Sequence, residues 1–155
     1  MEIESEARAY RLLDDVHQAP SVREAAVRYL AKHASPNAIQ HMTLALNDDD
    51  FGVHWEAAAS LAELGMAALP SVLTALTKPD LAASPRMREG AYHVLHYNSA
   101  PEIRNYAARL MEALKGSAAD ITTLVEANRW LEQIESKQRK TRRTSARARY
   151  SGVVS

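Results

Sequence analysis

Residues 53–65 read VHWEAAASLAELG, and this stretch decides the fold because its small and apolar residues recur with the period of an α-helix. Val53, Ala57 and Leu61 are spaced four residues apart, so they share one face of that helix. Trp55 follows Val53 by two positions, about 200° around the helix axis. The segment therefore predicts a helix with a narrow packing face and a tryptophan on the other side.

The same pattern occurs three more times, in VREAAVRYL from Val22, MREGAYHVL from Met87 and IRNYAARLM from Ile103. Each copy begins with an apolar residue, has Ala at the fifth place and ends with Leu or Met. The first three copies begin 31 and 34 residues apart, a period typical of helical repeats. The fourth begins only 16 residues after the third, so we interpret it as a partner helix inside a repeat unit.

A second set of apolar segments lies between these copies: PNAIQHMTLAL from Pro36 and ALPSVLTAL from Ala68, each followed by a polar turn. With the V-R-x-x-A pattern and the acidic turns, residues 21–97 resemble the HEAT repeat family, and residues 101–135 resemble it loosely. The resemblance implies stacked helix pairs in which the V-R helices line an inner, concave surface. His54 stands where the other three copies have Arg, so the second unit departs from the polar contact between repeats that the resemblance implies.

The fold class predicted is therefore all-α: a short right-handed α-solenoid of three to four HEAT-like helix pairs over residues 1–136. Asp50, Ser84 and Ser117 are predicted as helix N-caps, and Gly65 and Gly116 as helix stops. The helices are expected at 3–17, 21–33, 36–47, 51–64, 67–77, 85–97, 101–115 and 118–136.

Charge divides the chain into two segments of opposite sign. Residues 1–136 hold twelve bases and all nineteen acids, whereas the C-terminal segment 137–155 holds seven bases and no acid. This composition predicts a basic tail that is disordered on its own, either throughout or after a helical start that continues from Glu135. Its ligand is expected to be anionic, either nucleic acid or a membrane surface, although a solvated tail and docking on the acidic body are alternatives. The seven tail bases are Lys137, Arg139, Lys140, Arg142, Arg143, Arg147 and Arg149.

The non-packing face of the V-R helices is the predicted binding surface. Trp55, Tyr92 and His93 are expected to meet there over small residues, and an exposed aromatic cluster of this kind is typical of an interface hot spot. The groove would take a segment of a partner protein; the alternative is that Trp55 fills a packing gap. The full predicted set is Glu24, Arg28, Trp55, Ala59, Ala62, Glu89, Tyr92, His93 and His96.

No catalytic site is predicted. Glu89, His93 and His96 share a helix face, but one carboxylate and two imidazoles are an incomplete ligand set, so no metal or other cofactor is expected. The chain has no cysteine, no phosphate-binding glycine motif and no nucleophile elbow. We therefore expect a non-catalytic adaptor or scaffold, located in the cytoplasm because no signal or membrane-spanning segment is evident. The alternative function is nucleic-acid association through the tail.

Overall fold

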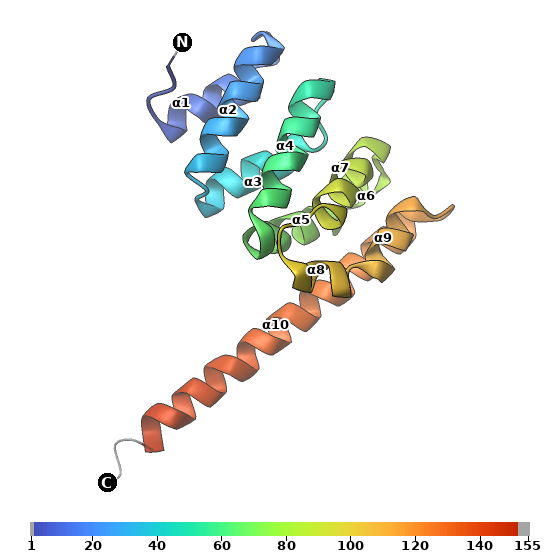
Figure 1. The fold of residues 1–155 in the computed structure, drawn as a ribbon. Coiled ribbons are helices and arrows are strands. Elements are labelled where there is room, and N and C mark those ends of the chain that lie inside the picture. The colour runs from blue at the N-terminus through green and yellow to red at the C-terminus, as the bar shows by residue number, and fades with distance from the viewer. Residues whose placement is uncertain (1, 152–155) are drawn as a thin grey trace.

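A computed structural model describes residues 2–151, and this part of the chain is built of helices without a strand (Figure 1). Two rows of helices pack against each other. One row, called here the inner row, contains α2 (Pro20–Lys32), α4 (Phe51–Glu63), α7 (Pro85–His96) and α9 (Ala108–Lys115). The outer row contains α1 (Glu6–Asp14), α3 (Pro36–Ala45), η1 (Gly65–Ala68), α5 (Leu69–Leu76), α6 (Pro79–Ala83) and α10 (Ala119–Ser151). The short helix α8 (Pro101–Tyr106) connects α7 to α9.

The predicted packing face is confirmed, and the protein is an all-α helical repeat. The four repeated alanines, Ala26, Ala57, Ala91 and Ala107, are fully buried. Because alanine adds only a methyl group, it allows α4 to pack closely between α2 and α7. The ninth positions of the first three copies, Leu30, Leu61 and Leu95, are buried in the same core.

Enlarging one of these alanines is expected to destabilise the fold. Ala57→Leu should lower the free energy of unfolding by about 1–3 kcal/mol, because the extra side-chain atoms have no space between α4 and its neighbours. Ala59→Leu is the matched control, since Ala59 is exposed on the same helix. Urea denaturation of both variants checks this expectation, and equal midpoints for the two would contradict the packing register.

Many predicted helix ends are found, but the first helix is shorter than the expected 3–17, and α10 begins at Ala119, so Ser117 is not its N-cap. Asp50 and Ser84 are side-chain caps of α4 and α7, and Gly65 follows α4 with φ +63°, a left-handed conformation that favours glycine. Two other segments also differ. The segment after Lys78 was expected to be a turn but holds α6. The helix expected over 101–115 is divided at Ala107 into α8 and α9.

The last two helices, α9 and α10, lie in the opposite rows to those that the sequence predicted. The segment from Ile103 was interpreted as a partner helix within a unit, but its second half, α9, packs beside α7 in the inner row. The long helix α10 instead packs on α5, α6 and α9 (Figure 1). The fourth copy of the pattern therefore contributes to the inner row, as the first three copies do, although it begins only 16 residues after the third.

In the first three repeat copies, the polar residue at the second place binds a carbonyl at the end of a preceding outer-row helix. Arg23 Nε donates to the Leu13 carbonyl at 2.9 Å, His54 Nδ1 lies 2.7 Å from the Leu46 carbonyl, and Arg88 donates to the Ala82 carbonyl at 2.7 Å. These carbonyls have no partner within their own helix. His54 thus makes the same type of contact as the arginines, although its residue type differs.

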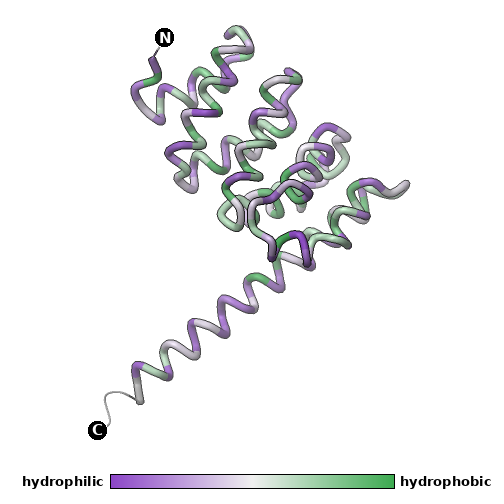
Figure 2. Tube along the Cα trace, viewed as in Figure 1, coloured by the Kyte–Doolittle hydropathy of each residue, from purple (hydrophilic) through white to green (hydrophobic). Residues whose placement is uncertain are grey.

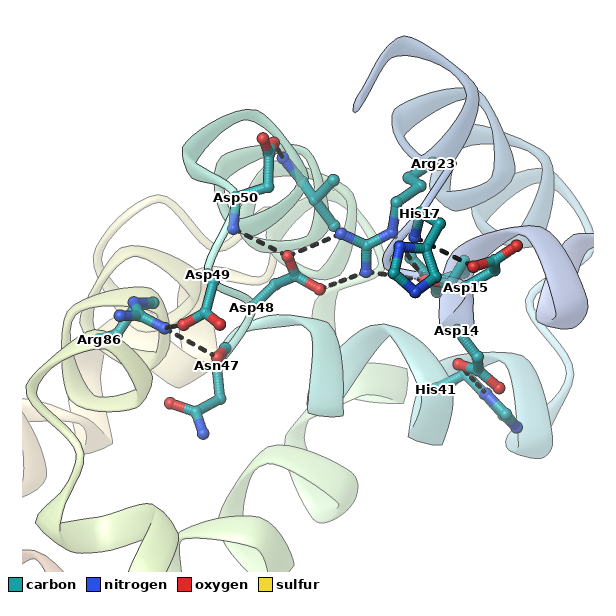
Figure 3. Close-up of polar contacts among 12 residues, drawn as sticks. Asp14, Asp15, His17, Arg23, His41, Asn47, Asp48, Asp49, Asp50 and Arg86 are labelled. Carbon is teal, nitrogen blue, oxygen red and sulfur yellow. Dashed lines mark hydrogen bonds and ion pairs between the residues drawn. The ribbon is translucent and has the colours of Figure 1, made fainter. Parts of the chain in front are cut away.

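Acidic residues of the turn between α3 and α4 bind arginines on both sides (Figure 3). Arg23 reaches Asp48 with two nitrogens, at 2.9 and 2.5 Å, and both side chains are largely buried. Arg86 at the start of α7 pairs with Asp49 and donates to the Asn47 carbonyl. One turn therefore links α2, the first inner helix, to α7, the third.

The Arg23–Asp48 pair predicts a loss of stability in acid. Burial of the Asp48 carboxylate opposes ionisation, but hydrogen bonds from Arg23 and the Asp50 backbone N–H outweigh it and hold its pKa below the usual 3.8. The unfolded chain then binds this proton at higher pH than the folded chain, so the contribution is complete well above pH 3.8 and is lost as the pH falls below it. Urea midpoints at pH 7 and at successively lower pH should fall more for the wild type than for Asp48→Asn. An identical decline in both proteins would show that this pair does not contribute.

The C-terminal segment differs from the predicted disorder. Over residues 137–151 the chain is helical, as the continuation of α10, and residues 152–155 lie outside the described part. No glycine or proline interrupts residues 117–151, and Arg, Lys, Gln and Ala are good helix formers. Basic side chains near a helix C-terminus also complement the helix dipole. Figure 2 shows that this projecting half of α10 is largely hydrophilic, and no described helix is long and apolar enough to cross a membrane.

Candidate interaction groove

A hollow of about 550 Å³ opens between α4, α7 and α9 on the inner row. Aromatic and imidazole rings form much of its wall, and charged side chains of both signs stand among them. We call this hollow the aromatic groove. Its lining residues are Trp55, Pro85, Arg88, Glu89, Tyr92, His93, Tyr97, Leu114 and Lys115.

Trp55 is half-buried, packing against the core with one part of its ring while another part lines the groove. Its ring centroid is 4.6 Å from that of His54 and 5.1 Å from that of His93, both edge-on. Phe51, one turn earlier on α4, also meets it edge-on at 5.8 Å. Edge-to-face contacts of this kind fix the orientation of a ring. Trp55 is thus held rigidly at the border between the core and the groove.

The rings of α7 continue the cluster toward α9. Tyr92 stacks on His96 with centroids 5.7 Å apart, and Tyr97 lies 4.6 Å from both His93 and His96. The Lys115 ammonium from α9 is 3.9 Å above the Tyr92 ring, a cation–π contact. Tyr97 remains 64% exposed, so much of this aromatic surface is accessible.

The surroundings of His93 favour its neutral form. Burial lowers the pKa of His93, and the nearby imidazoles of His54 and His96 lower it further. His54 is itself buried, and its Nε2 has no hydrogen-bond partner. A neutral imidazole offers an apolar ring face, so His93 adds to the aromatic wall near neutral pH.

The structure brings some predicted groove residues together and separates others. Trp55, Glu89, Tyr92 and His93 line the same hollow, and His96 stacks beside it. The remaining predicted positions, Glu24, Arg28, Ala59 and Ala62, are not part of its lining.

Three of those four residues can be placed individually: one is buried, one forms an ion pair and one is exposed. Ala62 was predicted to line the surface but is buried at 4% exposure, because its helix turns that side toward the loop after α7, where Ser99 N–H donates to the Ala62 carbonyl. Arg28 instead pairs with Glu56 at 3.3 Å on the surface of α2 and α4. Ala59 is exposed.

Five lining residues were not in the predicted set: Pro85, Arg88, Tyr97, Leu114 and Lys115. Tyr97 follows the last residue of α7 and lies outside the nine-residue repeat pattern, which ends at Leu95. Leu114 and Lys115 belong to α9, whose position beside α7 was not expected. The one sequence feature that could have indicated this part of the groove is Tyr97, an aromatic residue in the polar stretch HYNS.

A second, larger cleft of about 880 Å³ lies between α10 and the α5–α8 side of the body, and it was also missed. Met66 and Tyr106 at its edge are 52% and 74% exposed. Trp130 and Ile134 of α10 form its floor with Leu69 and Ile103, and Lys137 and Arg142 stand at its rim. This cleft exists because α10 packs on the outer row, which the repeat pattern did not indicate.

Metal binding finds no support in the described residues, because no three His, Asp or Glu side chains among residues 2–151 lie together as a ligand group. Glu89, His93 and His96 share a helix face without forming such a group.

Comparison with known proteins gives one positive result. A family model described as HEAT repeats matches residues 7–96, more than half of the chain. Searches of curated proteins and of solved structures each returned no significant match. The match covers α1 to α7, which supply Trp55, Glu89, Tyr92 and His93 to the aromatic groove.

Proposed function

The chain belongs to the HEAT repeat family, and from that premise we propose that it is a non-catalytic interaction module, an adaptor with two binding surfaces. The aromatic groove binds a segment of a partner protein. The basic end of α10 binds an anionic partner. HEAT repeats commonly act as protein-interaction scaffolds, which supports the general class of function.

The observation that carries the groove proposal is the accessible ring cluster held in a hollow. Trp and Tyr at the centre of a concave surface are the residues that contribute most to protein interfaces. Lys115 and Arg88 stand beside the rings, so the preferred segment carries an apolar or aromatic anchor next to an acidic residue. The acidic residue pairs with these bases while the anchor packs on Trp55 and Tyr97.

A peptide selection tests this proposal. Peptides selected from a random displayed library against the wild-type protein should contain an aromatic or large apolar residue near Asp or Glu. Their affinity should fall at least about tenfold for Tyr97→Ala, since an interface tyrosine contributes on the order of 1–2 kcal/mol or more. Tyr106→Ala is the matched control, because Tyr106 is also a largely exposed tyrosine but lines the second cleft instead.

The control also separates the two surfaces. If the selected peptides lose affinity in Tyr106→Ala and keep it in Tyr97→Ala, the cleft beside α10 is the protein-binding site and the groove proposal is wrong. The alternative function, nucleic-acid association through the basic segment, predicts no peptide preference in the groove.

A further inference from the structure

The basic half of α10 extends away from the repeat body (Figure 1). Residues 137–149 are all exposed, and the segment is helical throughout. Thirteen helical residues span about 20 Å at 1.5 Å per residue. A continuous positively charged helix of this length therefore projects from the repeat body, away from the inner row and its aromatic groove.

The charges on this helix are distributed around it in a specific way. At 100° per residue, with Ile134 as the zero line, the bases fall between about 60° and about 300°. The remaining arc, centred on Ile134, carries Gln138, Thr141, Ser145 and Ala148. The helix thus presents bases on both flanks and on its back, and a narrow uncharged stripe of mostly small side chains between the two flanks.

This distribution does not suit a membrane surface. An interfacial membrane helix inserts large apolar side chains on one face and keeps its bases on the other. The uncharged arc of this segment contains no large apolar residue beyond Ile134, which lies in the cleft against the body. Binding to an anionic bilayer would leave half of the bases directed away from it.

The distribution suits a groove with negative charge on both walls. The major groove of B-form DNA is about 12 Å wide and admits an α-helix, with phosphates on either side. The major groove of A-form RNA is too deep and narrow for this. Small residues on the uncharged arc allow the helix to approach the floor of the groove while the two flanks reach the phosphates.

We propose that residues 137–149 of α10 bind duplex DNA as a helix in the major groove, with the bases on its two flanks contacting phosphates. The proposal rests on the anionic-partner part of the proposed function and is independent of the aromatic groove. Basic residues one turn apart on a flank, such as Lys137 and Lys140, repel each other along the helix in the absence of DNA. Phosphates relieve that repulsion, so DNA binding stabilises this end of α10.

Fluorescence anisotropy of the full chain with a labelled 20-base-pair duplex tests the proposal. If about five phosphates are contacted, the logarithm of the affinity falls with the logarithm of the salt concentration with a slope of about −4.5. The affinity then decreases on the order of 500-fold between 50 and 200 mM salt. Replacing Lys137, Arg142 and Arg149, the bases nearest the uncharged stripe on its two sides, together by Gln should reduce the slope by about 2.7.

Two controls connect the result to this helix. Replacing Arg8, Arg11 and Lys32 by Gln removes the same charge from exposed positions of α1 and α2 and should leave the slope unchanged. Thr144→Pro keeps every charge but breaks the helix in the middle of the basic segment, and should weaken duplex binding at least about tenfold. Thr144→Ala, which favours the helix, should bind at least as tightly as the wild type. Residue 144 lies outside the body contacts, so thermal unfolding of the repeat body should be unchanged.

The outcomes separate the inference from the broader proposal. Equal duplex binding by Thr144→Pro and Thr144→Ala, or tighter binding to phosphatidylserine vesicles or to an RNA duplex than to DNA, overturns the groove-bound helix and leaves an anionic partner in place. Absence of binding to the duplexes and vesicles at 50 mM salt overturns both. Self-association that disappears with salt, without DNA binding, identifies the acidic body of a second copy as the partner and also overturns the inference.

Discussion

Arg23→Ala is expected to lower the free energy of unfolding by about 3–5 kcal/mol, because it leaves the largely buried Asp48 carboxylate without its partner. The same substitution removes the donor to the Leu13 carbonyl at the end of α1. Both losses occur inside the contact between α1, α2 and the turn before α4 (Figure 3). Chemical denaturation with circular dichroism detection measures the change.

Arg28→Ala is the control for this prediction. Arg28 lies on the same helix and also pairs with an acid, Glu56, but its side chain is 51% exposed. A solvent-exposed pair contributes about 0–1 kcal/mol, so this variant should stay near the wild type. Adding Asp48→Asn to Arg23→Ala should recover part of the loss, because a neutral amide is less costly to bury than an unpaired charge. Equal effects of Arg23→Ala and Arg28→Ala would show that the buried pair does not stabilise the repeat junction.

These arginines also show how far the fold could be predicted from sequence. The repeat alignment identified the polar second position in each copy, since periodic spacing is visible in a single sequence. Its partners were not visible: the Leu13, Leu46 and Ala82 carbonyls follow from where the preceding helices end. The row exchange of α9 and α10 was missed for a related reason. The rows of α9 and α10 depend on how these last helices pack against α5 and α7. Helix periodicity shows which face of a helix is buried but not which other helix covers that face.

The aromatic groove was predictable in part because its central residues lie on two aligned helices. Angles around a helix placed Trp55 and His93 on the same side correctly. They gave Ala62 the wrong surroundings, since the loop after α7 covers that position. Lys115 was not predictable, because it reaches Tyr92 from a helix far along the sequence. The composition of the tail indicated its charge, but it did not indicate the uninterrupted run of helix formers from residue 117 to 151, over which α10 extends.

Trp55→Ala is expected to weaken peptide binding and also to lower the free energy of unfolding. A fully buried large-to-small change costs about 3–5 kcal/mol, and Trp55 keeps part of its ring in the groove, so the expected loss of stability is about 2 kcal/mol. The affinity for peptides selected against the wild type should fall by at least about 2 kcal/mol, roughly 30-fold, as for an interface hot spot. Both quantities are measured at a temperature where the variant is folded.

Phe51→Ala is the matched control, because Phe51 touches Trp55 edge-on from the same helix, is 75% exposed and does not line the groove. It removes one edge-to-face ring contact, so it should change stability and peptide affinity by at most about 0.5–1.5 kcal/mol, less than Trp55→Ala does. In a Trp130→Phe background Trp55 is the single tryptophan, and bound peptide should shift its emission to shorter wavelength and protect it from iodide. A loss of stability in Trp55→Ala with unchanged peptide affinity in the folded protein would make Trp55 a packing residue at the α4–α7 contact. In that case the binding surface would have to lie elsewhere on the repeat, because the aromatic groove is built around this ring.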